Sequence, residues 1–140
     1  MDNIRLTYEV EGGDLTQAGE ASAQVKQTLR KLGFDPDTIR RVSVCMYEGE
    51  INMVIHADGG TATVDIGLSD ITITLADQGP GIPDIDQAMQ AGYTTAGEVA
   101  RDLGFGAGMG LPNMKRYSDE MEIDTTVGVG TTVTMRINIA

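Results

Sequence analysis

Two glycine-rich clusters, separated by a polar loop, are the part of the sequence most suited to chemistry. The first spans residues 77–83 and reads DQGPGIP, and the second spans residues 104–113 and reads GFGAGMGLPN. Glycine has no Cβ, so successive backbone N–H groups in such turns can approach an anion closely and surround it. A helix that begins near Gly110 would add its positive end to the attraction. The pair of clusters therefore favours an anion-binding site over two merely mobile loops.

Carboxylate and amide side chains stand in the second half of a strongly apolar helical segment, from about Asp37 to His56. Glu48 and Asn52 are four residues apart, so they share one face of that helix. Burying a carboxylate is costly unless it is paired or coordinated. Glu48 is therefore a candidate for a functional role, with the alternative that it simply points to water. A local hydrogen bond at the helix end is the favoured explanation for His56.

The composition limits the class of protein and its partners. The chain has 140 residues, 41% of them hydrophobic, and a formal net charge of −11. So acidic a chain is repelled by nucleic acid and by anionic membrane surfaces, which argues against both as partners. The single cysteine, Cys45, excludes an internal disulfide and is expected to pack in the core. No apolar run approaches a membrane span and no signal segment opens the chain, so we expect a cytoplasmic protein.

Hydrophobic periodicity predicts the elements that would position these groups. Apolar and polar side chains alternate in five segments, which we expect to be strands: residues 3–10, 61–68, 71–76, 121–127 and 131–139. Apolar residues recur every three or four positions in helices expected over residues 14–32, 37–56, 84–90 and 110–119. We expect Asp14, Asp35 and Asp84 to cap the first three of these helices and Gly33 to end the first.

The order of these elements predicts an α+β fold. Tight turns at residues 58–60, 69–70 and 128–130 would join antiparallel strands, giving a two-layer sandwich whose mixed, mostly antiparallel sheet has helices on one face. Residues 92–108 show no apolar periodicity, and an unpatterned loop of this length is typical of a functional lid.

In these motifs the chain resembles the histidine-kinase-like ATPase superfamily, whose Bergerat fold is shared by gyrase, Hsp90, histidine kinases and MutL. EGEIN at residues 48–52 is similar to the helical motif in which a glutamate precedes an asparagine by four. Residues 77–82 and 106–111 resemble its two glycine boxes, and GVGT at 128–131 resembles its closing motif. The match is nearest to the small serine/threonine kinases of bacterial sigma-factor control, of the RsbT/RsbW type. It implies one ATP-binding domain over residues 1–140, with an ATP lid at about 92–108.

The resemblance implies a role for each matching residue. Asp77 would accept a hydrogen bond from the adenine amino group, Gly81 would allow close approach to the ring, and Thr131 would support that contact. Asn52 would bind Mg²⁺ and the nucleotide, and Glu48 would be the catalytic base toward a substrate hydroxyl.

The remaining nucleotide contacts implied by the resemblance lie in the glycine boxes and the lid: Gly79, Ile82, Thr94, Thr95, Gly106, Ala107, Gly108, Met109, Gly110 and Leu111. Arg101, Lys115 or Arg116 could neutralise the transferred phosphoryl group, with the alternative that the pair on the helix is simply solvated. Residues 98–103 make the lid longer than the RsbT-type pattern.

The function implied is that of an ATP- and Mg²⁺-dependent serine/threonine protein kinase, an anti-sigma regulatory factor that phosphorylates a STAS-type antagonist protein. The alternative is an ATP-gated module that sequesters a sigma factor or another partner without phosphoryl transfer. An ATP hydrolase with no protein acceptor is a third, less favoured interpretation. The sequence does not identify the acceptor protein. It leaves open whether the chain contacts a sigma factor directly and whether it forms a homodimer.

Overall fold

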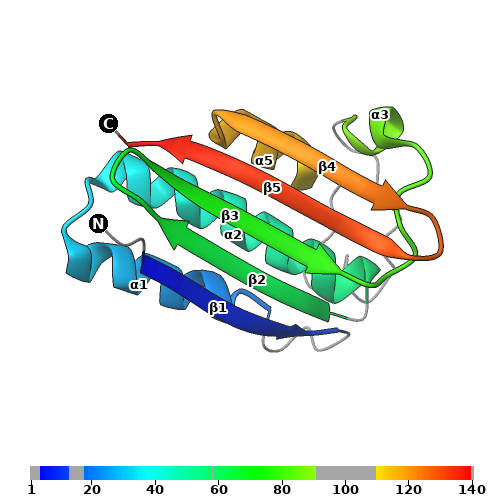
Figure 1. Ribbon diagram of the computed structural model, residues 1–140, viewed down its shortest axis with the longest axis horizontal. Helices are drawn as coiled ribbons and strands as arrows, with labels where there is room; N and C mark the ends of the chain where they lie inside the picture. Colours follow the sequence, from blue (N-terminus) through cyan, green and yellow to red (C-terminus); the bar gives the residue numbers. More distant parts are fainter. Residues whose placement is uncertain (1–3, 13–17, 58, 91–109, 140) are drawn as a thin grey trace.

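The computed structural model describes residues 4–12, 18–57, 59–90 and 110–139, which form an antiparallel sheet covered on one face by helices (Figure 1). The strand order is β1-β2-β3-β5-β4, and all the pairings between these strands are antiparallel. The strands are β1 (Ile4–Glu11), β2 (Gly59–Ile66), β3 (Asp70–Asp77), β4 (Glu120–Thr126) and β5 (Gly130–Asn138). The predicted α+β class is confirmed, and within the described strands the sheet contains no parallel pair.

The helix α2 (Pro36–His56) lies at the centre of the second layer (Figure 1). It packs against the sheet, against α1 (Glu20–Leu32) on one side and against α5 (Gly110–Tyr117) on the other. A short helix, α3 (Ile85–Ala88), follows the first glycine box. None of the described helices is long and apolar enough to cross a membrane.

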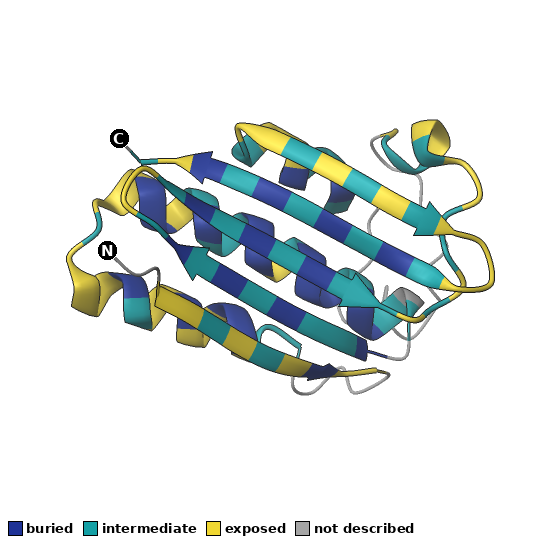
Figure 2. Ribbon diagram, in the orientation of Figure 1, coloured by how far each residue is buried: buried dark blue, intermediate teal, exposed yellow. Residues whose placement is uncertain are grey.

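The alternation predicted for the strands places one set of side chains in the core and the other in solvent. Along β3, Ile71, Ile73 and Leu75 are buried, whereas Thr72 and Thr74 are partly exposed on the open face (Figure 2). Neighbouring strands alternate in the same way, so buried and exposed positions form rows across the sheet. The apolar face packs on α2, whose buried residues include Val42, Met46 and Met53.

The start of α1 differs from the prediction. The N-cap residue is Gly19, with φ 94°, and it offers no side chain to the helix. The expectation that Asp14 caps this helix is therefore wrong, and Asp14 itself lies outside the described residues. The physical reason is that Glu50 of α2 accepts hydrogen bonds from the backbone N–H groups of Ala21 and Ser22 at 3.1 and 3.0 Å. A carboxylate from another helix thus takes the place of a local cap.

Two predicted turns are also displaced. Gly59 and Gly60 belong to β2, where Gly60 pairs with Val10 and with Asp77. The second displaced turn joins β2 to β3. It lies at residues 67–69 because β2 ends at Ile66 and Asp70 already belongs to β3.

Other local signals are confirmed. The Asp35 carboxylate accepts the Thr38 N–H at 2.7 Å, and the Asp84 carboxylate accepts the Gln87 N–H at 3.0 Å. Gly33 ends α1 in the left-handed conformation, with φ 85°.

Candidate functional site

The second half of α2 faces the start of α5, and this contact brings two of the predicted motifs together. A Cβ added to Gly110 would lie 3.1 Å from Asn52 Oδ1 and 3.2 Å from Asn52 Nδ2. The Asn52 amide therefore lies directly against the first residue of α5. Since the N–H groups at a helix start have no partner inside the helix, this is a place where an amide oxygen and free backbone donors meet.

Glu48 lies one turn before Asn52 on α2 and is half-buried. Burial raises the pKa of the Glu48 carboxyl, and a hydrogen bond from the Asn113 side chain of α5 acts in the opposite direction. Glu48 is therefore held at the contact between α2 and α5 and does not simply point to water. Asn113 closes the second glycine-rich cluster, but the motifs predicted no role of its own for it; its place three residues after Gly110 puts it on the first turn of the same helix.

Asp77, the last residue of β3, ties the first glycine box to β5. Its Oδ1 accepts the Gly79 N–H at 2.9 Å and the Thr131 N–H at 3.2 Å. Within the described part of the chain both bonds fall on the same oxygen. The other oxygen, Oδ2, therefore keeps its capacity to accept a donor from a ligand.

A pair of threonine hydroxyls supports this end of the site. Thr131 is 7% exposed, and its Oγ1 lies 2.8 Å from Thr125 Oγ1. Thr125 Oγ1 in turn accepts the Ile82 N–H at 2.9 Å, so the first glycine box is attached to the β4–β5 hairpin. Sequence reasoning missed Thr125; the signal that could have found it is the closing hairpin, in which Thr125 stands directly opposite Thr131.

The two glycines of the first box are required by packing within the chain itself. Gly81 has φ 80°, and a Cβ there would lie 2.6 Å from the Thr126 carbonyl oxygen. A Cβ on Gly79 would lie 2.7 Å from that of Ala57, just after α2. These contacts hold the loop close to the end of α2 and to the β4–β5 hairpin, whatever the glycines do for a ligand.

Part of the predicted site falls outside the described residues. This applies to Thr94, Thr95, Gly106, Ala107, Gly108 and Met109, to Arg101 and to the lid at 92–108. The side chain of His56 is likewise not described. Leu111 is described, and its side chain is buried in the core at the first turn of α5, so only its backbone could contact a ligand.

The two basic residues of α5 lie far from its start. Lys115 and Arg116 are exposed in the last turn, five and six residues after Gly110. At 1.5 Å per residue, about 8–9 Å of helix separates them from the glycine box. Both residues therefore stand at the opposite end of α5 from the glycine box, and a contact of either with a phosphate stays a prediction.

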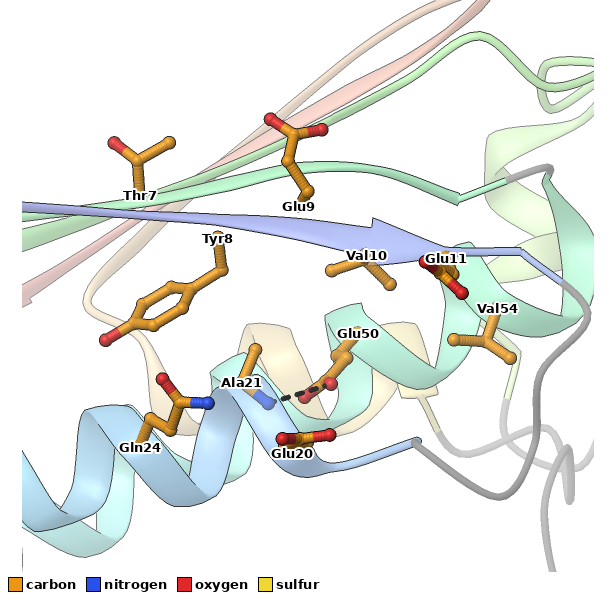
Figure 3. A pocket seen from close by; sticks show the side chains of 10 residues that line it. All are labelled: Thr7, Tyr8, Glu9, Val10, Glu11, Glu20, Ala21, Gln24, Glu50 and Val54. Carbon is orange, nitrogen blue, oxygen red and sulfur yellow. Dashed lines mark hydrogen bonds between the residues drawn. The ribbon is translucent and has the colours of Figure 1, made fainter.

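A cavity of about 320 Å³ lies elsewhere, between β1, α1 and α2 (Figure 3). Its lining includes four glutamates, Glu9, Glu11, Glu20 and Glu50, and the last of these is hydrogen-bonded to the backbone of Ala21. So negative a lining opposes a triphosphate. The acidic cavity is therefore distinct from the place where Asn52 meets Gly110, although Glu50 of the same helix lines it, and only the latter place suits a nucleotide.

Comparison with known proteins gives concordant results. The family model described as histidine kinase-like ATPase domain matches residues 13–137. The serine/threonine-protein kinase RsbT of Bacillus subtilis (strain 168) is 32% identical over 112 residues, which cover 77% of this chain and 78% of RsbT. An anti-sigma F factor of Geobacillus kaustophilus (strain HTA426) is 30% identical over 129 residues, covering 86% of this chain and 85% of that protein.

A solved structure supports the fold. The chain resembles part of the crystal structure of the RsbU and RsbW domains of Rv1364c from Mycobacterium tuberculosis, with a TM-score of 0.60 and 18% sequence identity. The similarity covers 96% of this chain and 32% of that one. At this identity the likeness concerns the arrangement of the sheet and helices alone.

Proposed function

Because the chain belongs to the histidine kinase-like ATPase family, we propose that it is an ATP-dependent serine/threonine protein kinase that acts on a STAS-type antagonist of an anti-sigma factor. The observation that carries this proposal is the meeting of Glu48 and Asn52 with the first turn of α5. This contact supports the proposal because a carboxylate and an amide side chain lie beside backbone donors suited to phosphate. The relatives named as a serine/threonine kinase and as anti-sigma F factors point to the same class of protein.

In this proposal Asp77 recognises the base of ATP. Its Oδ1 is held by the backbone of Gly79 and Thr131, which fixes the orientation of the carboxylate. Its Oδ2 would then accept the adenine amino group, and Gly81 would let the ring approach the backbone. Recognition at a pre-oriented carboxylate is favourable because its own hydrogen bonds need not rearrange.

The phosphates would lie at the start of α5. Mg²⁺ is usually held by one or two protein oxygen ligands, with phosphates and water completing the shell. The Asn52 side chain fits this role because it already lies against Gly110. The described residues hold no group of three or more His, Cys, Asp and Glu placed for a metal. In this proposal Asn52 and the phosphates would hold the ion. When bound, Mg²⁺ would neutralise the charge that develops on the phosphate oxygens.

Glu48 would act as the general base. Its carboxylate takes the proton of a serine or threonine hydroxyl while the hydroxyl oxygen bonds to the γ-phosphorus. The bond from that phosphorus to the bridging oxygen breaks, and ADP leaves with the electron pair. The remainder of the catalysis is positioning, to which closure of the 92–108 lid over the nucleotide would contribute.

The second candidate is an ATP-gated binding module, and the anti-sigma F factors among the relatives favour it. In such a module the nucleotide would change the affinity for a sigma factor, and Glu48 would not be required. A ligand shifts such an equilibrium only by its differential affinity for the two states. Partner binding should then differ between the ATP-bound and nucleotide-free protein.

The test uses the whole chain with γ-labelled ATP, Mg²⁺ and STAS-domain proteins from the same organism. Transfer of label to a serine or threonine by the wild type, and its loss in Glu48→Gln with ATP binding retained, supports the kinase. Nucleotide-dependent binding of a partner without any transfer supports the module instead. A wild type that neither transfers label nor shows a thermal shift with ATP contradicts both.

A further inference from the structure

Two arginines from different helices share one aromatic ring at the far end of the α2–α5 contact. The guanidinium carbons of Arg40 on α2 and Arg116 on α5 each lie 5.6 Å from the centroid of the Tyr117 ring. We call these three residues the arginine–tyrosine cluster. The chain has 10 basic and 21 acidic residues, so two positive charges on one ring depart from its overall charge. The ring face offsets part of their mutual repulsion.

The neighbouring ion pairs do not neutralise the cluster. Arg41 pairs with Asp119 at 2.8 Å and also donates to the Tyr117 carbonyl oxygen at 3.2 Å, which fixes the end of α5 against α2. Arg40 lies 3.9 Å from Asp37, and the two side chains are 67% and 71% exposed. So exposed a pair is weak, because solvent screens it. The guanidinium of Arg40 therefore remains able to bind another carboxylate, and Arg116 is exposed beside it.

The cluster lies on the same helix contact as Glu48. Asn113 and Tyr117 are four residues apart on α5 and share a face; Asn113 meets Glu48, and Tyr117 meets Arg40. On α2, eight residues separate Arg40 from Glu48, or about 12 Å at 1.5 Å per residue. A protein whose hydroxyl reaches Glu48 therefore needs to extend only about 12 Å further along α2 to contact the cluster.

We infer that the arginine–tyrosine cluster is the docking surface for an acidic segment of the protein acceptor. This inference rests on the proposed function and adds to it the chemistry of the partner. The net charge of −11 repels an acidic partner from most approaches, so a local positive surface both attracts that partner and orients it. Arginine suits this role because its planar guanidinium binds a carboxylate through two parallel hydrogen bonds.

The test compares the double variant Arg40→Glu/Arg116→Glu with a matched control, Arg30→Glu/Lys31→Glu, which makes the same charge change in the exposed last turn of α1. The probe is the STAS-domain protein, and calorimetry with ADP present gives its Kd. We expect the cluster variant to bind it at least about tenfold more weakly and the control to bind within about twofold of wild type. The acceptor KM should rise by a similar factor, with kcat and the affinity for ATP nearly unchanged.

Added salt provides a second readout. Wild-type binding should weaken as NaCl increases, and the cluster variant should show a flatter dependence because its share of the attraction is gone. The variant Arg40→Lys/Arg116→Lys, which keeps the charge, should retain most of the affinity. Equal Kd values for wild type and the cluster variant overturn the inference, as does an equal loss in the control. If the acceptor binds tightly but receives no phosphoryl group, the proposed kinase activity is contradicted and the docking inference is not. The docking inference is tested by the Kd of the acceptor.

Discussion

Glu50 accepts a hydrogen bond from the backbone N–H of Ser22, 28 residues earlier in the chain, at 3.0 Å. Its second oxygen accepts the Ala21 N–H, and the side chain is 3% exposed. Because α1 has no cap of its own, Glu50→Ala would leave two donors at a buried helix start without a partner. We expect the free energy of unfolding to fall by about 2–4 kcal/mol, measured by urea denaturation.

The control for that substitution is Glu20→Ala. Glu20 is an exposed acid in the same first turn of α1, so its removal changes the charge without removing an acceptor from Ala21 or Ser22. The loss there should stay below about 0.5–1 kcal/mol. Equal losses in the two variants would mean that charge near the helix start matters and that the specific hydrogen bonds do not.

Asp77→Asn should separate ligand recognition from folding. The asparagine oxygen can still accept from Gly79 and Thr131, so the loop keeps its structure. The other carboxylate oxygen becomes an NH₂ donor, which cannot accept the adenine amino group. We expect ATP affinity to fall by at least about tenfold, with a nearly unchanged melting temperature in the absence of nucleotide. Calorimetric titration measures the affinity, and full affinity in the variant would exclude Asp77 as the adenine acceptor.

Gly110→Ala should affect binding and stability in opposite directions. Alanine is a better helix former than glycine, by about 1 kcal/mol at an interior position and less at the end of a helix. The added Cβ would lie 3.1 Å from Asn52 Oδ1, so the amide must move. We therefore expect a melting temperature equal to or above that of wild type. ATP should bind more weakly than to wild type, and the loss of affinity should be larger with Mg²⁺ present than without it. Unchanged binding with and without Mg²⁺ would argue against Asn52 as its ligand.

Cys45 should be unreactive in the folded protein. Its side chain is 0% exposed, and burial raises the pKa of the thiol to about 12, with Arg41 opposing the shift and Glu48 adding to it. The thiolate is the nucleophile, so at pH 8 iodoacetamide should modify Cys45 only through unfolded molecules. Mass spectrometry over time measures this reaction, with protein in urea as the reactive control. Rapid alkylation of the native protein would contradict this placement.

The sequence predicted those features that depend on local pattern. Strand positions are confirmed to within about two residues because each strand has one buried and one exposed face. The cap at Asp35 and the helix end at Gly33 are confirmed because each acts within a single turn. The predictions at Asp14 and Gly59 fail because Glu50 supplies the cap from another helix and because β2 pairs on both sides.

In the candidate site, too, some residues are predictable from local motifs and others depend on tertiary contacts. Glu48, Asn52, Asp77 and Thr131 stand in recognisable motifs, so sequence reasoning selected them. Asn113 and Thr125 match no motif position to which a role was assigned, because they act through the packing of α5 on α2 and the register of β4 with β5. The supporting shell of this site follows from tertiary contacts, which a single sequence does not display.

Glu48→Gln should lower activity and raise stability at neutral pH. Burial raises the pKa of Glu48 in the folded state, so the folded protein holds that proton more tightly than the unfolded chain. The contribution of this carboxyl to the free energy of unfolding is therefore greatest below its pKa in the unfolded chain. That contribution is lost as the pH rises through its pKa in the folded protein. Glutamine removes this loss; because the group is half-exposed, the gain at pH 7 should not exceed about 1 kcal/mol and should vanish near pH 4. Phosphoryl transfer should fall by about 10²–10⁴-fold.

The pH profile of transfer tests the contact between Glu48 and Asn113. A general base must be ionised, so the rate should rise with pH through the raised pKa of Glu48 and then level off. The hydrogen bond from Asn113 lowers that pKa, and Asn113→Ala should therefore move the midpoint of the profile to higher pH while ATP affinity stays the same. An unmoved midpoint, with transfer still abolished in Glu48→Gln, would show that Asn113 does not set the ionisation of the base. A profile with no acidic limb would remove Glu48 from that role.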